Sequence, residues 1–148
     1  MKIVIQRVTK AKVVIEEKVQ SEIKNGLLLF LGIEHSDTET DVNWLCKKVA
    51  NMRIFSDAEG LMNLSVKDIG GELLLVSQFT LLANAKKGNR PSFIQAARPE
   101  QAIPLYELMI QQLNIELGKE IKTGVFGADM QIEIINDGPV TILLDTKN

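Results

Sequence analysis

Two short and almost purely apolar segments restrict the fold of this chain more than any other feature of its sequence. One covers residues 27–33, after Asn25-Gly26, and the other starts at Glu72, after Gly70-Gly71, and continues to Leu82. Apolar runs of this length between turn residues are typical of strands that are covered on both faces. The two segments therefore predict a sheet with packed layers on either side.

Helical spacing appears in two places. Ser36 and Glu39 have the spacing of a capping box, and the apolar residues after them predict a helix over residues 37–51. A second helix is predicted over residues 99–117, and Pro104 inside it leaves open whether the helix starts later or bends.

The other segments are predicted to be extended. Strands are expected at residues 2–7, 12–15, 19–23, 131–135 and 140–145, with short extended pieces around 53–63 and a turn at 136–139. Two helices and about eight strands indicate a single α/β domain over residues 1–148, layered and with more sheet than helix cover. A sheet face left uncovered would favour pairing of two copies.

The composition of the chain restricts which kinds of binding site and function it can have. The formal net charge of −2 gives no global field that attracts nucleic acid, so any RNA-facing surface has to be local. One His and one Cys do not suffice for a dedicated zinc site, and Cys46 lies on the apolar stripe of the first helix, where packing is its expected role. No apolar run reaches the roughly 18 residues of a membrane span.

The second apolar segment becomes polar at residues 77–80. An unpaired polar group in a buried strand costs about 1–3 kcal/mol, so these side chains need partners. One interpretation is that they bond neighbouring backbone groups at a strand end. The other is that the N–H groups of Phe79 and Thr80 stabilise a developing oxyanion. The basic loop that follows, with Lys86, Lys87 and Arg90, is by default a solvated loop and alternatively a phosphate or RNA contact.

Gly138-Pro139 is a second unusual segment. Such a dipeptide usually marks only a turn. A cis bond before proline lies only about 0.5–1 kcal/mol above trans, and it would direct two successive carbonyls the same way, toward an ammonium group. Together with the polar strand end, this arrangement would suit hydrolysis of an aminoacyl ester without a metal or cofactor.

Several motifs cover essentially the whole chain in the same order as in a known family. They are Val4–Val8, Met52–Phe55, Gly60–Asn63, Ser77–Thr80, Lys87–Phe93, Thr123–Met130 and Asn136–Thr141. In these segments the chain resembles the D-aminoacyl-tRNA deacylases, also called D-tyrosyl-tRNA deacylases. The resemblance implies a deacylase-type fold with mixed, barrel-like sheets and two main helices. It also implies a cytoplasmic homodimer, with active sites at the subunit interface, that releases a free D-amino acid and tRNA from D-aminoacyl-tRNA.

The resemblance also implies roles for individual residues. Ser77, Gln78, Phe79 and Thr80 would line the catalytic pocket, and Thr80 is expected to position substrate because no base lies near it in sequence. Phe126 and Met130 would contact substrate near the terminal adenosine and the pocket wall. Gly138 and Pro139 would contact it too: in the family they are joined by a cis bond and enter the partner's site. There they reject L-amino acids, while glycine passes.

Two further assignments complete the expected site. Arg7 would steady the Gly-Pro element. Lys86, Lys87 and Arg90 would contact phosphates of tRNA, beside Asn84, where many relatives carry Asp.

Two alternatives stay open at this point. The chain could be an RNA-binding module without catalysis, or a related deacylase with a trans Gly-Pro bond that acts on L-aminoacyl-tRNA.

Overall fold

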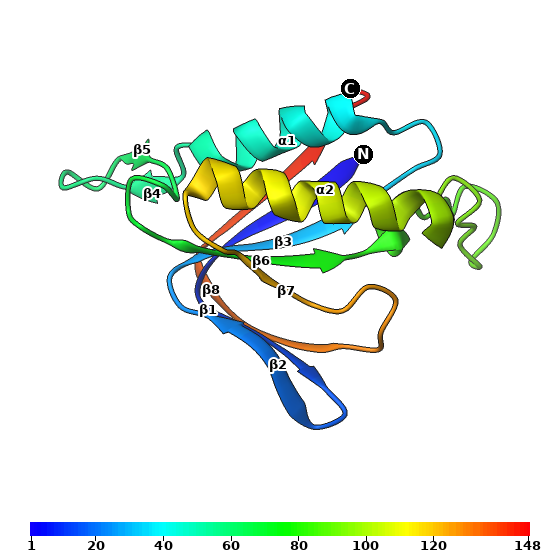
Figure 1. Cartoon of the computed structure of the whole chain (residues 1–148), viewed down its shortest axis with the longest axis horizontal. Coiled ribbons are helices and arrows are strands. Elements are labelled where there is room, and N and C mark those ends of the chain that lie inside the picture. Colours follow the sequence, from blue (N-terminus) through cyan, green and yellow to red (C-terminus); the bar gives the residue numbers. More distant parts are fainter.

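The long strand β1 (Lys2–Ile15) organises the sheet, because three other strands pair with it. In the computed structural model, which describes residues 1–148, β1 pairs on one side with β3 (Gly26–Gly32) along its first half and with β2 (Lys18–Ile23) along its second half. On the other side it pairs with β8 (Gln131–Asp145) over its whole length. All three pairings are antiparallel (Figure 1).

The sheet continues beyond β3 through two parallel pairings. Strand β6 (Glu72–Ser77) pairs with β3, and β7 (Lys122–Thr123) pairs with β6, so that the sheet is mixed. A separate small ribbon is formed by β4 (Phe55–Ser56) and β5 (Met62–Leu64). Because β3 and β6 run in the same direction, their carboxyl ends meet at one edge of the sheet.

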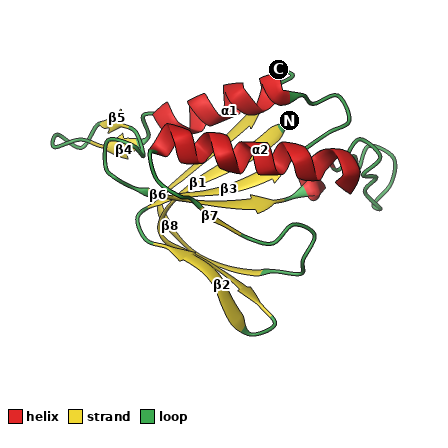
Figure 2. Ribbon diagram, viewed as in Figure 1, coloured by secondary structure: helices red, strands yellow, loops and turns green.

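Two helices, α1 (Glu39–Asn51) and α2 (Pro99–Leu117), cover one face of the sheet (Figure 2). Alternate residues of β3 serve different cores. Leu27 and Leu29 belong to the core under the helices, whereas Leu28 belongs to a second core on the other face. The prediction that the apolar strands are covered on both faces is therefore confirmed.

The second core forms because the β1–β2 hairpin curls back over the sheet. Ser21 on β2 donates a hydrogen bond from its hydroxyl to the carbonyl of Thr123 on β7, at 2.7 Å. This contact brings the two ends of the strand order together, and the sheet is nearly closed. The layered, barrel-like α/β architecture with two main helices is confirmed.

The structure corrects two predicted boundaries, the start of α1 and the end of β6. Helix α1 is capped by Thr38 and Asp41 and not by Ser36 and Glu39. The Asp41 carboxylate accepts a hydrogen bond from the Thr38 N–H at 2.8 Å. The second apolar strand ends at Ser77, and Phe79–Leu82 forms a 3-10 turn, η1. Helix α2 has the predicted bounds, and Pro104, whose effect the sequence left open, lies inside it.

The largest difference concerns the two ends of the chain. The sequence predicted two strands at each end, but β1 and β8 are each continuous. The predicted turn at 136–139 is a bulge inside β8: residues 137–140 lie opposite Arg7 alone, because Gln6 pairs with Thr141 and Val8 pairs with Asn136. A bulge adds residues to one strand without ending the pairing, which is why a turn-like sequence lies within a strand.

Two further features agree with the sequence. Cys46 is buried in the helix-side core, and this burial raises the pKa of its thiol to about 12, so the thiol packs as an apolar group. Neither helix combines the length and the apolar composition needed to cross a membrane.

Candidate active site

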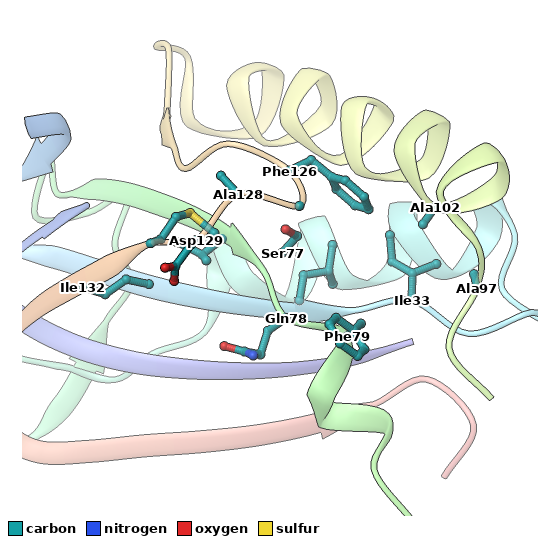
Figure 3. Close-up of a pocket in the computed structure, with 14 residues that line it drawn as sticks. Ile33, Ser77, Gln78, Phe79, Ala97, Ala102, Phe126, Ala128, Asp129 and Ile132 are labelled. Carbon is teal, nitrogen blue, oxygen red and sulfur yellow. The ribbon is translucent and has the colours of Figure 1, made fainter. Parts of the chain in front are cut away.

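A cavity of about 280 Å³ opens at the edge where the parallel strands β3 and β6 end. Its walls come from the ends of these strands, from the start of α2 and from the loop between β7 and β8 (Figure 3). Five of the predicted site residues line it together: Ser77, Gln78, Phe79, Phe126 and Met130. These residues are up to 53 positions apart in sequence, and the fold brings them together around one cavity.

The polar strand end turns sharply at the cavity. Gln78 donates its backbone N–H to the carbonyl of Leu31 at 2.7 Å, and the 3-10 turn begins directly after it. Leu81 is the first residue to donate within this turn, to the Gln78 carbonyl at 3.2 Å. The N–H groups of Phe79 and Thr80 therefore have no partner inside the turn, as is general for the first residues of a helical segment.

Thr80 is not part of the cavity wall. It is exposed, and its hydroxyl oxygen accepts a hydrogen bond from the side-chain amide of Gln78. Phe79 is 57% exposed, and its ring meets the ring of Phe93 edge-on, with centroids 5.2 Å apart. This contact joins the cavity rim to the basic loop.

Tyr106 on α2 holds two walls of the cavity in position. Its hydroxyl donates to the Leu75 carbonyl at 3.1 Å, and the N–H of Gly124 donates to the same carbonyl at 3.0 Å. The ring of Tyr106 also packs edge-on against Phe126, with centroids 5.5 Å apart. The sequence showed Tyr106 only as part of an apolar stripe, because nothing in the helical spacing indicates where its hydroxyl bonds.

The Tyr106 hydroxyl makes stability depend on pH in the alkaline range. Burial raises the pKa of Tyr106 to about 12, whereas an unfolded tyrosine titrates near 10. The folded state therefore keeps the proton at pH values where the unfolded state releases it, so the free energy of unfolding falls as pH rises from about 10 to 12. Tyr106→Phe has no hydroxyl to titrate, so we expect its unfolding free energy to depend less steeply on pH between about 10 and 12.

Urea unfolding at several pH values tests this expectation. The chain has a single Tyr, so phenolate absorbance reports its titration directly. Equal slopes for the wild type and Tyr106→Phe would contradict the assignment.

Arg7 lies against the bulge of β8. Its guanidinium donates to the Ile54 carbonyl at 2.7 Å and to the Asp137 carbonyl at 3.2 Å, and it also lies 3.2 Å from the Asp137 carboxylate. The Gly138–Pro139 peptide bond, whose isomer the sequence left open, is cis. Gly138 and Pro139 are both exposed, and neither they nor Arg7 line the cavity of their own chain.

The basic loop is exposed and free of ion pairs. Lys86, Lys87 and Arg90 form no salt bridge and do not line the cavity. Backbone hydrogen bonds between Asn84 and Ser92, at 2.8 and 2.9 Å, close the base of the loop. Its three cations thus point to solvent near the cavity rim.

Comparison with known proteins gives consistent matches over nearly the full chain. Residues 4–145 match the family described as D-Tyr-tRNA(Tyr) deacylase. A protein of Flavobacterium psychrophilum named D-aminoacyl-tRNA deacylase is 59% identical over 148 residues, covering 100% of this chain and 99% of its own. A protein of Cytophaga hutchinsonii with the same name is 63% identical over 145 residues, covering 98% and 97%.

Solved structures agree with these matches. The structure named c-Myc DNA Unwinding Element Binding Protein has a TM-score of 0.92 at 42% identity and covers 99% of both chains. A structure described as a probable eukaryotic D-amino acid tRNA deacylase has a TM-score of 0.83 at 14% identity and covers 97% of both chains, a likeness of fold alone.

Proposed function

This chain belongs to the D-Tyr-tRNA(Tyr) deacylase family, and from that membership we propose that it hydrolyses the ester bond between a D-amino acid and tRNA. Relatives that are 55–63% identical over nearly the full chain share the name D-aminoacyl-tRNA deacylase, which denotes a hydrolase. The observation that carries the proposal is the cavity at the end of β6, where the strand turns and leaves the N–H groups of Phe79 and Thr80 without a partner in the turn.

The proposed reaction needs only water and the chain's own groups. Water attacks the ester carbonyl carbon, and the negative charge that develops on the carbonyl oxygen is stabilised by the N–H groups of Phe79 and Thr80. The bond to the ribose oxygen then breaks, and this oxygen takes a proton, which yields a free amino acid and tRNA. The 2′-hydroxyl of the terminal ribose assists the attacking water.

Thr80 acts in this scheme as a positioning residue. A threonine hydroxyl needs a base in order to attack, and the Thr80 hydroxyl instead accepts from the Gln78 amide. We expect Thr80→Ala to lose about tenfold in kcat and to keep turnover well above the uncatalysed rate, because the variant loses one hydrogen bond, which contributes about 0.5–1.5 kcal/mol. Single-turnover hydrolysis of D-Tyr-tRNA measures this. Complete loss of turnover in a folded Thr80→Ala protein would indicate an obligatory nucleophile instead.

Chiral selection is assigned to Gly138 and Pro139 of a second copy. The bulge that carries them is exposed and lies outside its own cavity, so it is free to enter the cavity of a partner. Strand β8 pairs only with β1, so its other edge has no strand partner, and its side chains Ile135 and Leu143 are exposed. An unpaired edge of this length invites a second copy. In the resulting homodimer, the bulge would obstruct an L side chain, and glycine, which has none, would pass.

Phe126 and Met130 provide the cavity wall for the terminal adenosine in this proposal, and Arg7 steadies the bulge through its contacts with Asp137. Action on tRNA also implies a cytoplasmic location.

Hydrolysis of matched substrates tests the proposal. Release of D-tyrosine but not L-tyrosine from charged tRNA supports a D-specific deacylase. Binding of tRNA without release of either would indicate an RNA-binding module, and release of the L-amino acid would indicate the related deacylase of opposite preference.

The basic loop is expected to bind the phosphates of tRNA. We expect simultaneous replacement of Lys86, Lys87 and Arg90 by alanine to raise KM with little change in kcat. Loss of three phosphate contacts with a single strand should also reduce the slope of log affinity against log salt by about 2.

A charge-matched control separates local contact from net charge. Replacing Lys18, Lys47 and Lys48 by alanine removes the same charge from surfaces that do not line the cavity. An equal rise in KM for both triple variants would contradict a specific role of the loop.

A further inference from the structure

Asp129 is the only ionisable side chain among the 14 residues that line the cavity. Ten of these residues are hydrophobic, and the remaining neutral ones are Ser77, Gln78 and Gly127. Figure 3 shows Asp129 with Ile132 toward one end of the cavity, and Ala97 and Ala102 toward the other. Because the other lining residues carry no charge, Asp129 is the one group of the cavity wall that can form an ion pair with a cationic ligand.

Asp129 is also the only aspartate of the chain whose carboxylate has no hydrogen bond or ion pair within the protein. The other six all have such partners: Asp37, Asp41, Asp57, Asp68, Asp137 and Asp145. Those contacts cap a helix, close turns or hold the ends of the chain. Asp129 is exposed and serves no such contact, so its carboxylate is available to a ligand.

The segment that carries Asp129 is held in place from two sides. The N–H of Gly124 donates to the Leu75 carbonyl at 3.0 Å, and Phe126 packs against Tyr106. A Cβ on Gly124 would lie 2.6 Å from the sulfur of Met130, so the chain before and after Asp129 is closely packed. The carboxylate is therefore presented from a fixed backbone.

From these observations we infer that Asp129 binds the α-ammonium group of the substrate and restricts the enzyme to aminoacyl esters whose amino group is free. The inference rests on the proposed function, because it takes an aminoacyl ester as the occupant of the cavity. An ammonium group has three N–H donors. Two can meet the carbonyls of Gly138 and Pro139 of the partner subunit, and the third meets the Asp129 carboxylate.

The same arrangement disfavours an N-acylated substrate. Acylation removes the positive charge and leaves the carboxylate opposite a neutral amide, which is bulkier and has one donor. Discrimination of this kind would exclude N-blocked D-aminoacyl esters from hydrolysis at this site.

The test compares two substrates, D-Tyr-tRNA and N-acetyl-D-Tyr-tRNA, with the full-length wild type, Asp129→Asn and Asp129→Glu. The wild type should prefer the free amine. Asp129→Asn should lose about tenfold in kcat/KM on the free amine, mainly through KM, with no loss on the acetylated substrate, since a hydrogen bond to a charged group contributes about one order of magnitude or more. Asp129→Glu should restore part of the preference.

Glu120→Gln provides the matched control, because it makes the same change in net charge at an exposed position outside the cavity. It should leave the ratio of the two rates unchanged. An equal loss on both substrates in Asp129→Asn, or no loss on either, would overturn the inference and leave the proposed function intact. A wild type inactive on both substrates would instead remove the proposed function and this inference with it.

Discussion

Replacement of Gly138 by alanine is expected to reduce kcat/KM for D-aminoacyl-tRNA by about 100-fold, because misplacement of a substrate-positioning element by about 1 Å has effects of this size. Gly138 has φ +121°, a backbone conformation that residues with a side chain rarely adopt. Its added Cβ would lie 3.0 Å from Cγ2 of Val140 and 3.1 Å from the Arg7 guanidinium. The bulge would have to shift, and the carbonyls that we propose to face the substrate would shift with it.

Steady-state kinetics with D- and L-Tyr-tRNA, together with circular dichroism, measure this effect. Gly118→Ala is the control: it also has positive φ, +69°, with no atom close to the added Cβ, and it ends α2 away from the cavity. It should lose about 1 kcal/mol of stability and no activity. A folded Gly138→Ala protein with wild-type kcat/KM and wild-type preference for D over L would exclude the bulge from the site.

Gly26→Ala is expected to have the largest effect on folding. A Cβ at this position would lie 1.9 Å from the carbonyl oxygen of Glu72, which is a backbone atom and cannot rotate away. Gly26 also pairs with Val8 in the neighbouring strand, so a shift would disturb both pairings of β3. We expect a loss of about 4 kcal/mol or more, which belongs to the largest effects of single substitutions.

Urea denaturation of the purified protein measures this loss, and the yield of folded protein measures it if the variant does not accumulate. Gly60→Ala provides the comparison, because its added Cβ meets no atom within 4 Å although φ is +81°. It should lose only about 1 kcal/mol. Equal unfolding midpoints for the two variants would show that the contact with Glu72 relaxes without cost.

The fold followed from the sequence where a local pattern decides the structure. The apolar segments that begin at residues 27 and 72 indicated strands covered on both faces, although the second was predicted to continue to Leu82 and ends at Ser77. Helical spacing located both helices to within two residues of where they begin. The sequence failed where pairing overrides local preference. Gly138-Pro139 has the composition of a turn, but β1 continues along β8 on both sides of it and keeps it within the strand.

The candidate site could be predicted only in part. Ser77, Gln78 and Thr80 stood out because polar residues interrupt an apolar run, and Phe126 and Met130 followed from the family resemblance. Tyr106 and Asp129 gave no such signal. The role of Tyr106 depends on a hydrogen bond to a strand 31 residues away, and that of Asp129 depends on the absence of any partner, which only the folded chain reveals.

The leucines of strand β3 do not by themselves fix its register against the neighbouring strands. Leu27, Leu28 and Leu29 are chemically equal, so a shift of one residue would exchange the occupants of the two cores without exposing anything apolar. The terminal glycines remove this ambiguity. Only glycine fits at position 26, because a Cβ there would lie 1.9 Å from the Glu72 carbonyl oxygen. A Cβ on Gly32 would come within 3.1 Å of Gln78 and Leu81, so a leucine shifted into either position has no room. Two residues without side chains thus determine which way every side chain between them faces.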